Sequence, residues 1–298
     1  MTTRPNEDLA PQATDLPLDF HLHTDLSPDA DVPIDAYARQ AVERRIAEIA
    51  ITDHVDFAPG TPAYRYASFE ERERAVRDAA ERWAPRGVAI RFGVEITYDS
   101  RHEPAIRDHL RNHAYDFVIG SIHVYANSPF DASRVASWVE GRPLAEIVAP
   151  YFEEVHRAIR SELFDTIGHL DFVKRYLMPH VTPAQLAQAP ELYEPLLVSL
   201  IETGTALEVN TSGLRQVAGE TYPAGPIVER YRLLGGTAVS AGSDAHRKES
   251  FTAGLEAGYG VVAAAGIRHL AVRRGGRRVD VALPDRFRPS TGSVETRT

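Results

Sequence analysis

The stretch that decides the fold is Leu18-Asp19-Phe20-His21-Leu22-His23, a short apolar run that passes directly into two histidines. Short runs of the same apolar, often β-branched character recur along the chain, and such runs are typical of β-strands. Seven of them are present, at 18–22, 48–52, 88–96, 117–122, 165–168, 206–209 and 237–241. The sequence therefore predicts a sheet of seven strands.

The segments between these runs have helical spacing. Two examples place apolar residues at i, i+3 and i+4, which lines one face of a helix. They are Ile34, Tyr37, Ala38, Ala41, Val42 and Ile46, and then Ile147, Tyr151, Val155 and Ile159. Seven β–α units with right-handed crossovers favour a parallel sheet that closes on itself. We expect a (β/α)7 or distorted TIM-like barrel, one domain over 18–283, with polar tails at 1–17 and 284–298.

The composition limits the class of ligand. The chain has 298 residues, of which 43% are hydrophobic, so it can bury one large core or two small ones. Its formal charge of -9 and pI near 5.7 disfavour a broad electrostatic grip on nucleic acid, which needs many Lys and Arg side chains. We therefore expect a small ligand held in a local pocket, and no nucleic-acid partner.

The absence of cysteine narrows the chemistry further. Disulfides are excluded, and a transition-metal site must use His, Asp and Glu side chains. The first seventeen residues contain no apolar run typical of a signal peptide. No stretch approaches the roughly 18 apolar residues of a membrane span. We expect a soluble, cytoplasmic protein without a membrane partner.

Potential metal ligands follow the predicted strands at the point where each strand ends. Six strands run into such residues, which are His21 and His23, Asp53 and His54, Glu95, His123, His169 and Asp171, and Asp244 and His246. In an α/β barrel the carboxyl ends of all strands meet at one face. These side chains should therefore surround a common pocket.

A structural role is the main alternative for each histidine taken alone. A lone His at a strand end is more often hydrogen-bonded or solvated than a ligand, and His-x-His merely places two side chains on one face. Six of the twelve histidines nevertheless lie at successive strand ends. The other six lie in helix or loop patterns, and they are His102, His109, His113, His156, His180 and His269. Independent structural roles would not produce this regularity, so we interpret the strand ends as a metal site.

The mixture of imidazole and carboxylate groups suits zinc, iron or manganese, and carboxylates can bridge two ions. A cluster this rich predicts two or three divalent ions, spaced about 3.5 to 4 Å apart, that make hydroxide from bound water and neutralise a phosphoryl group. Phosphomonoester hydrolysis needs such help, because it is among the slowest uncatalysed reactions. A small phosphorylated substrate is the expected partner.

These motifs resemble those of the polymerase and histidinol phosphatase (PHP) family over residues 18–260. The resemblance implies nine metal ligands, namely His21, His23, Asp29, His54, Glu95, His123, His169, Asp244 and His246. Asp29 depends on the resemblance alone, since an Asp after Ser-Pro is more often a turn or capping residue. The chain departs from the plainest family pattern in its acidic N-terminal tail and in its Arg-rich C-terminal part, which contains Arg273, Arg274, Arg277 and Arg278.

Further motifs look like those of the histidinol-phosphatase branch, and they lie at 130–131, 168–176, 208–215 and 222–223. The branch implies hydrolysis of L-histidinol phosphate to L-histidinol and phosphate, a step of histidine biosynthesis. The nucleophile would be a metal-bridging hydroxide, so that no side-chain nucleophile is needed. The resemblance implies a first ion on His21, His23, Glu95 and Asp244, with Glu95 bridging to a second on His123 and His169. It leaves Asp29, His54 and His246 to complete a third site or to bridge to it.

Four cations follow strand-end motifs and are candidate phosphate contacts, because guanidinium and ammonium groups bind phosphate oxygens. They are Lys174, Arg175, Arg215 and Arg247. A surface salt bridge is the alternative for each. Asp53 and Asp171, which are adjacent to ligand motifs, are candidates to orient ligating imidazoles, although either could equally be a cap.

Two other functions fit the same motifs. A phosphoesterase with this metal site could act on nucleoside monophosphates or oligonucleotide ends, because fold and metals do not set the leaving group. A non-catalytic metal-binding module is the second alternative, and the intact ligand set argues against it. A comparison of histidinol phosphate with AMP as substrates separates the first alternative from histidinol-phosphatase activity.

Overall fold

The computed structural model describes residues 15–123, 128–274 and 276–287. Its strands are β1 (Leu18–Leu22), β2 (Glu48–Ile51), β3 (His54–Val55), β4 (Ala89–Thr97), β5 (Phe117–Ser121), β6 (Thr166–Ile167), β7 (Ala206–Asn210), β8 (Val239–Gly242), β9 (His269–Arg274) and β10 (Arg277–Ala282). Its helices are α1 (Ile34–Arg44), α2 (Phe69–Trp83), α3 (Glu103–Asn112), α4 (Val135–Val139), α5 (Leu144–Arg160), α6 (Val173–Leu177), α7 (Pro183–Ala187), α8 (Pro190–Thr203), α9 (Gly225–Leu233) and α10 (Leu255–Ala264).

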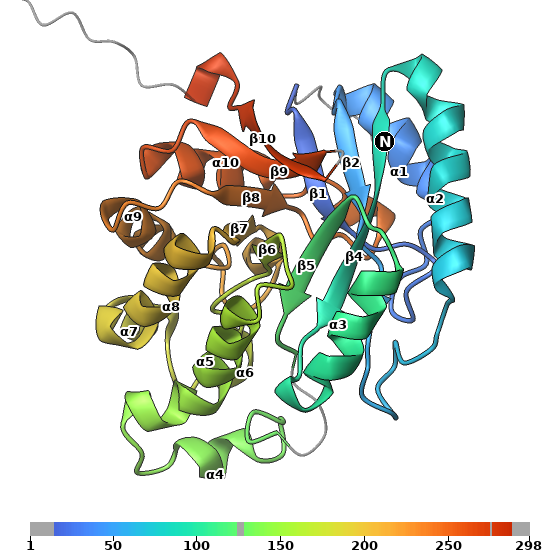
Figure 1. Ribbon diagram of the computed structural model, residues 1–298. Coiled ribbons are helices and arrows are strands. Elements are labelled where there is room, and N and C mark those ends of the chain that lie inside the picture. Colours follow the sequence, from blue (N-terminus) through green and yellow to red (C-terminus); the bar gives the residue numbers. More distant parts are fainter. Residues whose placement is uncertain (1–14, 124–127, 275, 288–298) are drawn as a thin grey trace, which may run out of the picture.

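The predicted barrel is confirmed. All seven predicted strands are present, and they pair in parallel in the order β1-β2-β4-β5-β6-β7-β8, with the short β3 beside β4. The two ends of this sheet meet where Leu22 forms a parallel bridge with Ala245. There the amide of His23 donates to the carbonyl of Ala245 at 3.0 Å. Figure 1 shows the helices arranged around the outside of the strands.

The two predicted helical patterns lie in α1 and α5. In α5, all four predicted apolar residues are buried. In α1 the pattern is correct only as far as Ala41, because Val42 is 38% exposed. The helix ends at Arg44, and Arg45 adopts a left-handed conformation with φ 57°. This turn places Ile46 in the core beyond the helix rather than on it.

A two-stranded antiparallel hairpin, β9–β10, was not predicted. It lies across the amino ends of the barrel strands, where Arg273 binds Asp165 before β6 and Arg274 binds Glu48 at the start of β2. Figure 1 shows it in red, beside β8. The Arg-rich segment therefore closes one end of the barrel. The assignment of His269 to a helix or loop was wrong, since it begins β9.

The packed region extends slightly beyond the predicted limits of 18–283. Leu16 is buried in the core, although the predicted tail included it. At the other end, Phe287 packs against the ring of Tyr259 on α10, with ring centroids 5.8 Å apart. Leu16 and Phe287 both have apolar side chains, and these pack against the barrel. Residues 1–14 and 288–298 of the predicted tails lie outside the described part of the chain.

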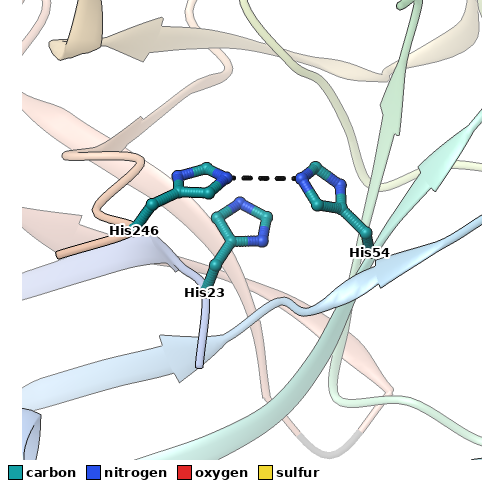
Figure 2. A group of neighbouring side chains, drawn as sticks. All are labelled: His23, His54 and His246. Carbon is teal, nitrogen blue, oxygen red and sulfur yellow. Dashed lines mark hydrogen bonds between the residues drawn. The ribbon is translucent and has the colours of Figure 1, made fainter. Parts of the chain in front are cut away.

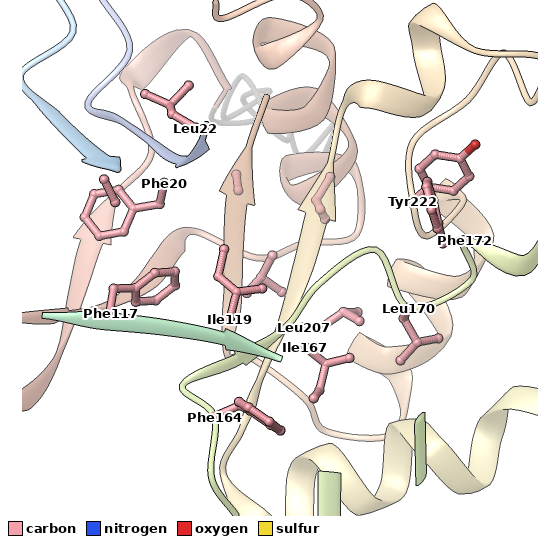
Figure 3. Packing of buried hydrophobic residues seen from close by; sticks show 14 of the residues in the cluster. Phe20, Leu22, Phe117, Ile119, Phe164, Ile167, Leu170, Phe172, Leu207 and Tyr222 are labelled. Carbon is pink, nitrogen blue, oxygen red and sulfur yellow. The ribbon is translucent and has the colours of Figure 1, made fainter. Parts of the chain in front are cut away.

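One hydrophobic core fills the barrel and the layer between strands and helices. Figure 3 shows part of it, with Phe20 of β1 edge-on to Phe117 of β5 at 5.2 Å between ring centroids. Phe172, which follows β6, meets Tyr222 in the same way at 5.1 Å. Among the described residues, no helix is both long enough and apolar enough to span a bilayer.

Candidate metal centre

The carboxyl ends of the strands bring all nine predicted ligands together. Glu95 of β4 lies at the centre of the cluster and is 1% exposed. Its Oε2 lies 3.3 Å from Nε2 of His21, 3.4 Å from Nε2 of His23 and 2.9 Å from Nδ1 of His54. Its Oε1 lies 3.0 Å from Nε2 of His169 and 3.5 Å from Nε2 of His123, so that one carboxylate contacts five imidazoles.

Asp244 and Asp29 are the other carboxylates of the cluster. Oδ1 of Asp244 lies 3.4 Å from both Nε2 of His23 and Nδ1 of His246. Asp29 is at the rim, with its side chain 53% exposed, and its Oδ2 lies 3.3 Å from Nε2 of His246 and 3.5 Å from Nε2 of His54. The structure therefore brings in Asp29, which the sequence patterns alone had not singled out.

Three overlapping groups have ligand atoms within 4.8 Å of one another. They are His21, His23 and Glu95, then His54, Glu95 and His123, and finally His23, His54 and His246. Figure 2 shows the last group, in which the facing Nε2 atoms of His54 and His246 are 3.4 Å apart. His54 is a member of both the second and the third group, whereas the resemblance had left it to complete a third site or to bridge to it.

Several ligand atoms are buried without a hydrogen-bond partner among the described residues. They are Nε2 of His21, Nε2 of His23, Oε2 of Glu95 and Nδ1 of His169. Leaving such groups unpaired costs free energy, and native proteins rarely do so without a reason. The first three belong to one group of potential ligands, so these residues fit a metal ion.

Electrostatics keep the central carboxylates ionised. Burial alone would raise the pKa of Glu95, but the imidazoles of His21, His54 and His123 more than offset burial and hold that pKa well below its usual range. The pKa of Asp244 is likewise held well below its usual range, against burial, by His21 and neighbouring imidazoles. Ionised oxygen ligands beside imidazoles are what a divalent transition metal requires.

Glu208, in the middle of β7, supports two ligands and was not predicted. Its Oε1 lies 2.6 Å from Nδ1 of His21, and its Oε2 accepts from the amide of His169 at 2.8 Å. A proton on Nδ1 of His21 leaves Nε2 with a free lone pair toward the cluster. The signal in the sequence was that β7, alone among the predicted strands, supplied no ligand although Glu208 is placed like the others.

Two predicted ligands have unusual backbone conformations. His169 has φ 28° and Asp244 has φ 52°, in the left-handed region that side chains rarely adopt. Such conformations tend to persist at functional sites, where surrounding contacts hold them. Next to Asp244, a Cβ on Gly242 would lie 2.2 Å from Cβ of His21, so only glycine lets β8 approach β1 closely enough for the cluster to form.

Asp53 acts on the ligands indirectly. Its carboxylate accepts from the amide and hydroxyl of Thr24 at 2.6 and 2.8 Å and from the hydroxyl of Ser27 at 3.0 Å. The Ser27 hydroxyl in turn accepts from the amide of His54 at 2.9 Å and lies 3.5 Å from Nδ1 of His23. Asp53 therefore holds the turn that positions the imidazoles rather than contacting them itself.

Asp171 does not orient an imidazole, contrary to the prediction. Its Oδ2 accepts from Nζ of Lys174 at 2.8 Å and from the amide of Ala224 at 3.3 Å. The chain turns into α6 directly after His169, and this turn directs Asp171 away from the cluster. Asp171 instead anchors a buried ion pair beside the site.

Two of the four predicted cations line the cavity over the cluster, which has a volume of about 510 Å³. Arg175 is exposed and stacks on the ring of Phe172 at 5.3 Å. Arg215 donates to the carbonyls of Ala253 at 3.0 Å and Ser243 at 2.8 Å, so its guanidinium is fixed against the wall. These two cations remain candidates for binding phosphate.

The predictions for Lys174 and Arg247 were wrong. Lys174 is fully buried, and its ammonium donates to Asp171, Glu220 and Thr221, so no proton remains for a ligand. Arg247 is 56% exposed and forms a surface ion pair with Asp31 at 3.0 Å. Neither lines the cavity. Position after a strand end does not determine where a long side chain points.

The chain is similar to known proteins over most of its length. The model of the PHP domain matches residues 19–212, and Asp244 and His246 lie beyond that match. A protein of Deinococcus radiodurans named "Probable histidinol-phosphatase" is 29% identical over 77% of this chain and 86% of its own length. One of Thermotoga maritima with the same name is 29% identical over 80% and 88%.

A solved structure shows the same fold. It is a histidinol phosphate phosphatase of Lactococcus lactis, complexed with zinc, L-histidinol and phosphate, with a TM-score of 0.76. The sequences are 22% identical, and the alignment covers 88% of this chain and 98% of that one. The fold is therefore shared, and the family match covers more than half of the 298 residues. On this evidence the chain belongs to the PHP family.

Proposed function

We propose that the chain is a metal-dependent histidinol-phosphatase, which hydrolyses L-histidinol phosphate to L-histidinol and phosphate. The observation that carries the proposal is the cluster of buried imidazole and carboxylate atoms around Glu95, several of which make no hydrogen bond within the described residues, open to a cavity that Arg175 and Arg215 line. Carboxylates and imidazoles attract metal ions, and guanidinium groups attract phosphate. Phosphomonoester hydrolysis of the proposed kind uses both the metal ions and the guanidinium groups.

The residues that would hold divalent zinc, iron or manganese ions are those of the three groups together with Asp29, His169 and Asp244. When bound, two or three such ions supply a nucleophile from water at neutral pH and offset charge on the phosphoryl group. Glu95 lies in two of the groups and could bridge two ions. The side chain of Glu208 holds Nδ1 of His21 at 2.6 Å, and the side chain of Thr97 holds Nδ1 of His123 at 2.9 Å.

The two cavity cations have different roles in this proposal. Arg215 is fixed by the carbonyls of Ser243, Asp244 and Ala253 and would present a preset charge to the phosphate. The guanidinium of Arg175 has no hydrogen bond or ion pair to the described part of the chain and rests on the ring of Phe172. It can therefore turn its planar fork toward phosphate oxygens without breaking an existing contact.

The relatives support this choice of substrate. Curated proteins that match about four fifths of the chain are named as histidinol-phosphatases, and the similar Lactococcus lactis structure contains L-histidinol and phosphate. The motifs at 168–176 and 208–215 contribute His169, Glu208 and Arg215 to this site. We place the reaction in histidine biosynthesis, a pathway of the cytoplasm.

A substrate panel tests the proposal. We expect the metal-loaded enzyme to prefer histidinol phosphate over both AMP and p-nitrophenyl phosphate in kcat/KM. An equal or reversed preference for AMP would assign the site to nucleoside monophosphates instead. Absence of hydrolysis of any phosphomonoester by metal-loaded protein would favour a non-catalytic module.

A further inference from the structure

The buried ammonium of Lys174 lies beside the candidate metal centre but faces away from it. Lys174 belongs to α6 and is 0% exposed. Its Nζ donates to Oδ2 of Asp171 at 2.8 Å, to Oε1 of Glu220 at 2.7 Å and to the carbonyl of Thr221 at 2.9 Å. It also lies 4.8 Å from the centre of the Tyr222 ring. A charge buried this completely requires such partners.

These contacts join two walls of the cavity. One wall is α6 and the residues before it, which carry Phe172 and Arg175. The other is the segment 212–222, which begins with a 3-10 turn (Ser212–Arg215) and carries Arg215 and Gln216. Lys174 is on the first wall, and Glu220 is on the second.

The second wall is compact, so the position of its last residues affects the position of those that line the cavity. A Cβ on Gly213 would lie 2.2 Å from the carbonyl oxygen of Glu220, so the segment folds tightly back on itself. The hydroxyl of Tyr222 donates to Oε1 of Gln216 at 3.0 Å. A contact that holds Glu220 and Tyr222 therefore also holds the residues that face the cavity.

We propose that Lys174 is a positioning residue, whose ammonium fixes the segment 212–222 against α6 and thereby sets the distance between the backbone segments that carry Arg175 and Arg215 across the cavity. This inference rests on the proposed function, in which phosphate binds between those two guanidinium groups. Both cations must reach one phosphate at once, so a displaced wall weakens binding even when every contacting residue is retained.

Glu220 offers the cleanest test, because its side chain is 34% exposed and it does not line the cavity. Glu220→Ala removes the side-chain partner of Lys174 on the second wall and leaves only the carbonyl of Thr221 to accept from it there, while Glu220→Gln keeps an oxygen acceptor. The matched control is Glu194→Ala, which removes a 2.6 Å ion pair with Arg230 between α8 and α9. The more disruptive Lys174→Met variant, which leaves Asp171 buried without its cation, is a second test.

Binding of inorganic phosphate to the metal-loaded enzyme is measured by calorimetry, alongside KM, kcat and metal content. We expect Glu220→Ala to weaken phosphate binding and raise KM by about tenfold, the scale of losing a hydrogen bond to a charged group. The kcat should fall less, metal content should not change, and Glu220→Gln should recover most of the loss. Lys174→Met should show the same pattern more strongly.

The result that would overturn the proposal is a Glu220→Ala variant that loses as much stability as Glu194→Ala but keeps the phosphate affinity and KM of the wild type. Lys174 would then only stabilise the fold. The proposed function fails differently, when wild-type enzyme does not prefer histidinol phosphate. Phosphate binding does not depend on the leaving group, so the two failures are distinguishable.

Discussion

Charged residues gather at both ends of the barrel, but the partners of their carboxylates differ between the two ends. At the amino ends of the strands, Glu48 accepts from Arg91 at 2.5 Å and also binds Arg274. Asp165 accepts from Arg273 and from the amide of Val118, each at 2.9 Å. These carboxylates are satisfied by guanidinium and amide groups of the chain itself.

At the carboxyl ends the carboxylates face imidazoles instead. Oε2 of Glu95 and the Nε2 atoms of His21 and His23 are buried and lack hydrogen-bond partners among the described residues. Because unsatisfied buried groups are costly, a protein retains them where something else completes them. The difference teaches that the hydrogen-bond status of strand-end charges, more than their number, separates a closing surface from a binding site.

The largest contrast is expected between Glu95→Ala and Glu48→Ala. Glu95 contacts five imidazoles, so its loss should lower turnover by roughly 10³-fold or more, given that changing a single outer partner of a metal ligand typically costs 10- to 100-fold. At least one ion should be lost as well. Glu48→Ala should keep turnover and metal content. Steady-state kinetics and elemental analysis of both variants provide the measurement.

If Glu95→Ala retained the metal content and turnover of the wild type, the assignment of the central ligand would be wrong. A loss of turnover in Glu48→Ala at unchanged stability would show that the amino end contributes to the site, and the contrast between the two ends would not hold.

Within the carboxyl end, Arg175→Ala should lower kcat/KM by roughly 10²-fold, a scale typical of one charged transition-state contact, without changing metal content. Arg175→Lys should recover part of this, because a point charge cannot reproduce the bidentate fork. The control is Arg247→Ala, which removes an exposed pair with Asp31 outside the cavity and should have little effect. If the two alanine variants had similar kinetics, Arg175 would be an ordinary exposed side chain without a role in binding phosphate.

Glu208→Ala should weaken metal binding by about 10- to 100-fold, because His21 would lose the partner that fixes its ring and its tautomer. The measurement is a competition between the protein and a chelator of known affinity. Unchanged metal affinity would mean that the barrel packing alone positions His21, and that Glu208 has another purpose.

The smallest functional effect is expected for the amino end. Arg274→Ala should lower the free energy of unfolding by about 1–2 kcal/mol, since Glu48 is nearly buried but keeps Arg91 as a second partner. Denaturant unfolding of the metal-loaded protein reports this change. The kcat should equal that of the wild type, and a reduced kcat would contradict the separation of the two ends.

The sequence predicted the strands and the clustering of the ligands because both depend on local patterns, an apolar run and the residue that ends it. It could not predict where a long side chain turns after the strand. Lys174 and Arg175 are neighbours, yet one is buried in an ion network and the other lines the cavity. Glu208 has a strand position like that of the ligands, but its role depends on a contact with His21 that this position does not reveal.

The hairpin of β9 and β10 was missed for a related reason. Its residues are rich in arginine and show no apolar run of the kind that predicted the other strands. Arg273 and Arg274 find their partners in Asp165 and Glu48, which lie at the start of distant strands. The structure also shows that His54 belongs to two of the three groups of potential ligands. The positions of these residues along the sequence do not reveal this.

The most direct test of the account is a metal titration of chelator-treated protein, followed by hydrolysis of histidinol phosphate and by elemental analysis on the same samples. We predict that metal-free protein is inactive and that manganese, zinc or iron restores activity in step with the ions bound, because the side chains at the carboxyl end supply no nucleophile of their own. Full activity in thoroughly metal-free protein would contradict the account.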